Sequence, residues 1–357
     1  MRQSLTWLTF MLGLTLVGLL CYVILYSLMT SRTHFSNTAY LEYQGLGGES
    51  ALNPQHAAWS LAPEPWVYEM KTRRRHLKDA CSSLKSPKKD GVPVRNITTE
   101  FMFVDERHRL LYCAIPKVGC TNFIRLMYGL TANADSDGYQ DIGAGEVHAE
   151  YRKYLTPLNS FSDFGIQFRL DHYLKVILVR HPFERLVSAF RNKLERHTIL
   201  SFNEGTIIAK YFEPHATKAT IRTGDGVTFE GFVRYLNFKA AKDPDALDQH
   251  WRRFFELCNP CDVHYDVIGR HETVERDVNM VLKVLGVADL FHYPRKNMQH
   301  VSSADLWKIY FTNVSSSQLT KLWAFYKLDG DLFNYTLNSL NFVVKKRLRN
   351  EHMAVLT

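Results

Sequence analysis

Residues that suit the binding of an anion stand close together in the stretch Leu110–Leu130. Lys117, Gly119 and Thr121 follow a short apolar run typical of a buried strand, and a helical pattern comes next. The first backbone N–H groups of a helix have no partners within the helix, and the helix dipole favours negative charge there. The stretch therefore indicates a site for phosphate or a similar oxyanion. Taken alone, it is equally compatible with an ordinary strand–helix turn that carries a surface lysine.

The segments on both sides of this turn predict how it is held. Leu110–Ile115 is apolar throughout and ends at Pro116, and Phe101–Asp105 is expected to pair with it as an edge strand. The pattern G-x-x-x-x-G-K-[ST] is absent, which argues against a kinase of the P-loop type. Four apolar residues recur at three- and four-residue spacing, as on one face of a helix: Phe123, Leu126, Met127 and Leu130.

A second unit of the same kind follows. Tyr173–Val179 has the composition of a buried parallel strand, and Arg180 stands at its carboxyl end, where open α/β sheets bind ligands. Pro182 suits the first turn of the helix that comes next, and Ser188 lies about two turns into it. Two strand–turn–helix units, each with positive charge and a hydroxyl, indicate a ligand with two separated anionic groups.

The two motifs, PKVGCTN and VRHPFERLVSAFRNK, resemble those of the Golgi carbohydrate sulfotransferases. The most similar branch contains the chondroitin, dermatan and GalNAc 4-O-sulfotransferases and the glucuronate 3-O-sulfotransferase of the HNK-1 epitope. The resemblance runs from about Phe101 to Tyr335 and includes HWRRFFELCNPC, HYDVIGRHET and YKLDGDLFNYT. It implies an α/β fold with a P-loop-like parallel sheet flanked by helices, preceded by a single transmembrane helix and a stem.

The resemblance also implies a role for the motif residues. In that family the first motif binds the 5′-phosphosulfate of PAPS (3′-phosphoadenosine 5′-phosphosulfate), and the second binds its 3′-phosphate. PAPS is the co-substrate, no metal is required, and Lys117 is a catalytic residue that stabilises charge on the leaving phosphate. The donor contacts implied in addition to Lys117 are the backbone amides of Val118, Gly119, Cys120, Thr121 and Asn122, with Arg180 and Ser188 at the 3′-phosphate.

A base must take the proton from the attacking sugar hydroxyl, and histidine suits this because its ordinary pKa lies near the working pH. His148 is the first choice, since related branches have a histidine in the corresponding loop. His250 is the second choice, and Glu184 and Glu272 are further candidates. A surface or packing role is the alternative for each of them.

The sequence defines the acceptor glycan less closely than the donor site. RTGDGVTF, LCNPC and FNYT look most similar to members that sulfate position 4 of GalNAc in chondroitin, dermatan or GalNAc-terminated glycans. Glucuronate 3-O-sulfation of the HNK-1 type is one alternative, and a non-catalytic lumenal glycan-binding protein is another. Two differences from the family's motifs leave the identity of the acceptor open. His181 stands in VRHP where many relatives have VREP, and Phe123 follows Asn122 where many have tryptophan.

The composition agrees with an anionic partner. The formal net charge is +8, and basic residues are frequent between Arg191 and Arg222. A basic balance suits nucleic acid, an anionic membrane or an acidic polysaccharide. No zinc-finger spacing or nucleic-acid motif is present, which favours the polysaccharide. Nothing in the sequence indicates an oligomeric state.

The N-terminal part predicts a membrane anchor. Residues 3–31 contain no charged residue, and Trp7–Met29 is long enough to span a bilayer and too long for a signal peptide. We therefore predict a cytoplasmic tail (1–6), a signal anchor (7–29), a stem (30–93) and a lumenal sulfotransferase domain (94–357). By resemblance, this is a single-pass type II protein of the Golgi membrane.

Glycosylation sequons and cysteines fit a lumenal domain. N-x-[ST] sequons stand at Asn96, Asn313 and Asn334. Five cysteines follow the apolar segment, so at least one of them is unpaired within the chain. Cys258 and Cys261 are expected to form a local structural disulfide, because a zinc site would need a second C-x-x-C.

Overall fold

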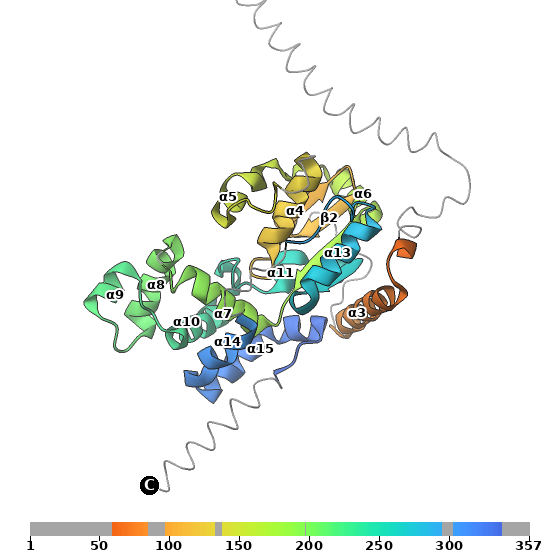
Figure 1. Cartoon of the computed structure of the whole chain (residues 1–357). Helices are drawn as coiled ribbons and strands as arrows, with labels where there is room; N and C mark the ends of the chain where they lie inside the picture. The colour runs from red at the N-terminus through yellow and green to blue at the C-terminus, as the bar shows by residue number, and fades with distance from the viewer. Residues whose placement is uncertain (1–58, 85–96, 133–137, 197, 295–302, 338–357) are drawn as a thin grey trace, which may run out of the picture. The chain divides into compact units, whose positions relative to one another are not determined.

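The strands form one mixed five-stranded sheet in the order β3–β1–β2–β4–β5. The computed structural model describes residues 59–84, 97–132, 138–196, 198–294 and 303–337 (Figure 1). β2, β4 and β5 are parallel to one another, whereas β1 pairs antiparallel with β2 and β3 pairs antiparallel with β1. The predicted antiparallel pairing of β1 with β2 is thus confirmed, but β3 rather than β1 lies at the edge of the sheet. The predicted parallel sheet is limited to β2, β4 and β5. The strands are β1 (Met102–Asp105), β2 (Leu110–Cys113), β3 (Thr156–Pro157), β4 (Leu174–Val179) and β5 (Val267–Arg270).

Helices surround this sheet and extend beyond it. The α-helices are α3 (Glu64–Ser83), α4 (Cys120–Ala132), α5 (Ala144–Ala149), α6 (Asp163–His172), α7 (Pro182–Lys193), α8 (Ile199–Phe212), α9 (Lys218–Thr223), α10 (Phe229–Lys242), α11 (Phe254–Cys258), α12 (Pro260–Val263), α13 (Val274–Val284), α14 (Ser303–Tyr310) and α15 (Ser316–Phe333). The 3₁₀ helices are η1 (Trp59–Leu61), η3 (Tyr151–Tyr154), η4 (Leu158–Ser160), η5 (Pro244–Ala246), η6 (His271–Thr273) and η7 (Phe311–Asn313).

The first hydrophobic core encloses the sheet. Every residue of β2 and β4 is buried, which explains why both strands are almost wholly apolar in sequence. α4 contacts β1, and α13 and α3 contact β5 (Figure 1). Phe123 of α4 stacks on Tyr112 of β2, with ring centroids 3.9 Å apart. The helical face predicted for residues 123–130 therefore packs on the sheet and holds the preceding turn.

A second core lies among α7, α8, α10, α14 and α15, which contact one another (Figure 1). It is rich in aromatic side chains: Phe183 stacks on Phe311 at 4.5 Å, and Trp251 is fully buried against Phe232. α7 follows Arg180 and His181 directly, so it carries the chain from the edge of the sheet into this second core. No pattern in the sequence separates this helical core from the core around the sheet.

Part of the predicted stem is built into the folded unit. Within residues 30–93 the structure describes 59–84, and there α3 buries Trp66, Met70 and Leu77 against the first core. Arg73 of this helix is bonded to the fully buried Asp277 of α13 at 2.7 Å. Trp66 donates to the same carboxylate. This stretch is therefore packed structure, and any spacer must lie outside α3.

The predicted local disulfide is wrong. Cys258 is bonded to Cys113 at the end of β2, and Cys261 is bonded to Cys81 of α3. The reason is that α11 and α12 turn the C-x-x-C segment so that one cysteine lies against the sheet and the other against α3. Cys120 is buried and lies outside both disulfides.

In the described parts of the chain no helix is both long and apolar enough to cross a bilayer, and the predicted anchor at 7–29 lies outside those parts. Asn96 also lies outside them. Asn313 in η7 and Asn334 after α15 are both exposed.

Candidate active site

The turn between β2 and α4 has an unusual backbone. Lys117 has a φ of 74° and Gly119 a φ of 103°, so both lie in the left-handed region. A Cβ added at Gly119 would lie 2.7 Å from the hydroxyl oxygen of Tyr293, which donates a hydrogen bond to the Gly119 carbonyl at 3.3 Å. Only glycine fits here, on grounds of both φ and space. A lysine held in a costly backbone conformation points to a functional turn.

Lys117 is surrounded by other positive groups. Its Nζ donates to Oδ1 of Asn192 at 3.0 Å. Burial lowers the pKa of Lys117 to about 8, and the charges of Lys193, Arg180 and Arg185 act in the same direction. Cations held close together in a partly buried place form a site that favours a multiply charged anion.

Arg180 links the two motifs predicted from the sequence. It stands at the end of β4 with 3% of its surface exposed. Its Nη1 donates to the carbonyl of Lys117 at 3.3 Å, and its Nε lies 3.3 Å from the Glu184 carboxylate. Ser188, the other predicted ligand of the second motif, is half-buried on α7. The structure thus brings the second motif's arginine onto the first motif's turn, as the sequence predicts.

Arg185 is a component of the site that was not predicted from the sequence. It is almost fully buried and donates to three backbone carbonyls: Pro116 at 2.9 Å, Arg252 at 2.6 Å and Gln249 at 2.8 Å. It therefore fixes the turn before Lys117 to a segment more than a hundred residues further along the chain. In the sequence, an arginine between two apolar helix positions looks like a surface residue.

His148 lies beside the first turn of α4. Its Nε2 is 3.1 Å from Oγ1 of Thr121, and the residue is exposed on the short helix α5. Asn122, the next residue of the predicted cradle, accepts a hydrogen bond from Arg125. The structure therefore places Lys117, Thr121 and His148 around one turn, as the sequence predicts.

The second-choice histidine also lies near Lys117. His250 is bonded through Nδ1 to Oδ1 of Asp248 at 2.6 Å. Lys193 and Lys117 are near enough to contribute to lowering its pKa, although burial is the largest cause. Asp248 was not predicted as a site residue. Its position two residues before His250 in the sequence could have indicated that the two side chains interact.

The two glutamates considered as bases already have partners. Glu184 pairs with Arg180, and Glu272 accepts a hydrogen bond from the Tyr335 hydroxyl at 3.1 Å. Both contacts stabilise the sheet edge beside the site. Neither glutamate is needed to explain the chemistry of the turn.

His181, the departure in VRHP, has a structural role. Its Nδ1 accepts from the backbone N–H of Phe183 at 3.2 Å and so caps α7. The proton must then be on Nε2, which donates to the carbonyl of Thr336 at 3.2 Å. Burial lowers the pKa of His181, which keeps this neutral form. Histidine thus supplies the acceptor that a helix N-terminus needs.

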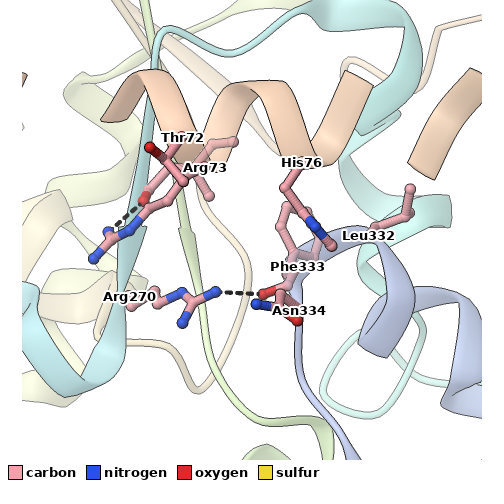
Figure 2. Close-up of a pocket in the computed structure, with 8 residues that line it drawn as sticks. Thr72, Arg73, His76, Arg270, Leu332, Phe333 and Asn334 are labelled. Atoms are coloured by element: carbon pink, nitrogen blue, oxygen red, sulfur yellow. Dashed lines mark hydrogen bonds between the residues drawn. The ribbon is translucent and has the colours of Figure 1, made fainter. Parts of the chain in front are cut away.

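A small pocket beside α3 is separate from this turn. Figure 2 shows Thr72, Arg73 and His76 of α3 facing Arg270, which donates to the carbonyl of Phe333 at 2.7 Å. Since Arg73 is already paired with Asp277, this pocket is best explained by the packing of α3 on the folded unit. Asn334, a predicted glycosylation acceptor, lies at its edge.

Comparison with known proteins identifies the class to which this fold and turn belong. Residues 101–336 match the sulfotransferase family, and the chain belongs to that family. No solved structure matches the chain.

The most similar relatives include three carbohydrate sulfotransferases. Carbohydrate sulfotransferase 11 of Rattus norvegicus is 36% identical over 267 residues, which cover 74% of this chain and 75% of the relative. Carbohydrate sulfotransferase 8 of Mus musculus is 35% identical over 274 residues, 74% of this chain and 63% of the relative. Carbohydrate sulfotransferase 10 of Danio rerio is 32% identical over 296 residues, 76% of each chain. The protein is thus a carbohydrate O-sulfotransferase.

Proposed function

We propose that this enzyme transfers a sulfuryl group from PAPS to a glycan hydroxyl. Lys117 and the amides of residues 118–122 hold the 5′-phosphosulfate, and Arg180 with Ser188 holds the 3′-phosphate. The observation that carries this proposal is the convergence of Lys117, Arg180 and Arg185 on one turn whose glycine leaves no room for a Cβ. Preorganised charge of this kind stabilises the charge that develops on a leaving phosphate.

The donor proposal predicts a pH dependence. Binding of PAP, the desulfated donor, is expected to weaken as the pH rises above about 8, because Lys117 then loses its proton and its charge. A bound anion favours the protonated lysine, so binding near this pH should take up protons. Calorimetry in two buffers of different ionisation enthalpy measures this uptake. An affinity unchanged between about pH 7 and pH 9.5 would contradict the assignment.

For the acceptor we propose position 4 of GalNAc, in chondroitin, dermatan or GalNAc-terminated glycans. The support is the resemblance of RTGDGVTF, LCNPC and FNYT to enzymes with that specificity. Glucuronate 3-O-sulfation is the alternative. The basic residues of α7 to α9, among them Arg191, Lys210 and Arg222, suit the carboxylate and sulfate groups of such a glycan.

For the proton of the attacking hydroxyl the sequence puts His148 forward, and its contact with Thr121 supports a place beside the acceptor. If His148 is the base, His148→Ala lowers kcat without changing PAP affinity. If His148 only contacts the acceptor sugar, the substitution raises mainly the KM for the glycan. A change confined to the affinity for PAP or for the glycan would assign the base to another group.

For location we propose the Golgi membrane, with residues 7–29 as the anchor of a type II protein and the folded unit in the lumen. Disulfides form and persist in such an oxidising compartment, and the two disulfides agree with it. The exposed sequons at Asn313 and Asn334 are accessible to glycosylation. Asn96 is proposed as a third acceptor.

An acceptor panel tests the function. The purified full-length enzyme is incubated with labelled PAPS and chondroitin, dermatan, a GalNAc-terminated glycan or a glucuronate-terminated glycan. Label on one acceptor, mapped to position 4 of GalNAc, is the expected result. Label on glucuronate would select the alternative specificity. PAP binding without transfer to any acceptor would favour a non-catalytic glycan-binding protein.

A further inference from the structure

Asp248 and His250 form a hydrogen-bonded pair in the segment before α11. Nδ1 of His250 and its backbone N–H both contact Oδ1 of Asp248, at 2.6 and 2.9 Å. A carboxylate bonded to one ring nitrogen fixes the tautomer: Nδ1 carries the proton, and Nε2 presents a lone pair. Across the described parts of the chain, Nε2 of His250 has no hydrogen-bond partner. The side chain is 15% exposed, so the ring is not fully enclosed by the protein.

The charges around the pair keep the imidazole neutral and the carboxylate ionised. Burial lowers the pKa of His250, and Lys193 and Lys117 add to this, whereas the bond to Asp248 opposes it. For Asp248, burial alone would raise the pKa, but the hydrogen bonds from His250 and the charge of Lys193 lower it overall. A neutral histidine beside an ionised carboxylate is the form in which a general base works.

Arg185 fixes this pair beside the donor turn. It donates to the carbonyls of Gln249 and Arg252, on the two sides of His250, and to that of Pro116, next to Lys117. One buried side chain therefore holds both segments in a single arrangement. His250 and Lys117 are kept close together by this contact rather than by their positions in the sequence.

We propose that His250 is the general base of sulfate transfer, with Asp248 as its positioning residue. The inference rests on the proposed function. The acceptor oxygen attacks sulfur and forms the new O–S bond, and the bridging S–O bond of the donor breaks with its electron pair leaving on the 5′-phosphate of PAP. The hydroxyl proton goes to Nε2 of His250, and Asp248 stabilises the imidazolium until solvent removes the proton.

His148 differs from His250 in the features that matter for this role. It is exposed on α5, and its Nε2 is already engaged by the Thr121 hydroxyl. We assign His148 to contact with the acceptor sugar. It is therefore the matched control: a second histidine beside the same turn, with a different expected effect.

The test uses the full-length wild type and the variants H250N, D248N and H148N. For each protein, kcat, KM and the affinity for PAP are measured as a function of pH. The substrates are labelled PAPS and desulfated chondroitin, or the panel acceptor that the wild type labels best. H250N should lower kcat by about 100-fold or more and leave PAP affinity unchanged. In the wild type, kcat should fall at acid pH as His250 is protonated, below the ordinary pKa of about 6.5. H250N should lack this fall of kcat at acid pH (the acid limb of the profile). H148N should keep the acid limb and raise mainly the KM for the glycan.

Two further variants separate a chemical role from a structural one. D248N should lower kcat by about tenfold or more and move the acid limb to lower pH, since the carboxylate that favours the imidazolium is gone. Activity of His250→Ala should be partly restored by added imidazole, which a folding defect would not allow. An active wild type whose kcat and acid limb are unchanged in H250N would overturn the inference. A wild type that transfers no sulfate to any panel acceptor would overturn the proposed function itself.

Discussion

Replacing Lys117 by alanine is expected to reduce sulfate transfer by about 10²–10³-fold or more, while the protein stays folded. Lys117 lies in the turn between β2 and α4, and its ammonium group donates a hydrogen bond to Asn192. Alanine and lysine have the same backbone cost at a positive φ, so the change removes the charge without a new strain in the turn. The measured quantities are the rate of transfer from labelled PAPS and the affinity for PAP.

Lys153→Ala is the control for this substitution. Lys153 is an exposed lysine whose side chain pairs with Glu150 on the surface, and its removal should leave transfer unchanged. Both variants should have the melting temperature of the wild type to within a few degrees. Full activity in purified Lys117→Ala would show that Lys117 is not a catalytic residue.

Replacing Arg185 by methionine is expected to destabilise the fold by about 3–5 kcal/mol. Methionine fills a similar volume, but it leaves the carbonyls of Pro116, Gln249 and Arg252 buried without their donor. The charge of Arg185 also offsets the buried carboxylate of Asp329, whose pKa burial raises to about 6. Denaturant unfolding of the full-length protein measures the loss.

Arg222→Met provides the comparison, because Arg222 is exposed on α9 and should change stability by no more than about 0.5 kcal/mol. Arg185→Lys keeps the charge but not the fork of donors, so it should recover only part of the loss. If Arg185→Met unfolds with the same free energy as Arg222→Met, the three hydrogen bonds do not hold the two segments together.

The donor turn could be predicted because its determinants are local. The apolar runs of β2 and β4, the proline and glycine of the turn and the helical spacing of residues 123–130 all act within a few residues. The same holds for Arg180, since the carboxyl end of a parallel strand is fixed by the strand itself. These features placed Lys117 and Arg180 at one edge of the sheet.

The parts that could not be predicted depend on contacts between distant segments. α3 buries only Trp66, Met70 and Leu77 along a helix otherwise rich in charged and polar residues, so its sequence resembles a polar linker. Its place is set by Asp277, about two hundred residues away. Cysteine pairing is likewise a property of the folded arrangement, which is why a local disulfide was expected and two distant ones were found.

The same disulfides set an order of events during synthesis. Cys81 and Cys113 emerge early, yet their partners follow 180 and 145 residues later. At about 5–20 residues per second, the first thiol waits roughly 10–40 s for its partner. By then the segment that carries Asp248 and His250 has also been made. The strand that leads to Lys117 is thus cross-linked only when nearly every part of the active site is present. A truncated chain that ends before Cys258 would leave Cys81 and Cys113 without their native partners, and no disulfide would hold the strand before the donor turn.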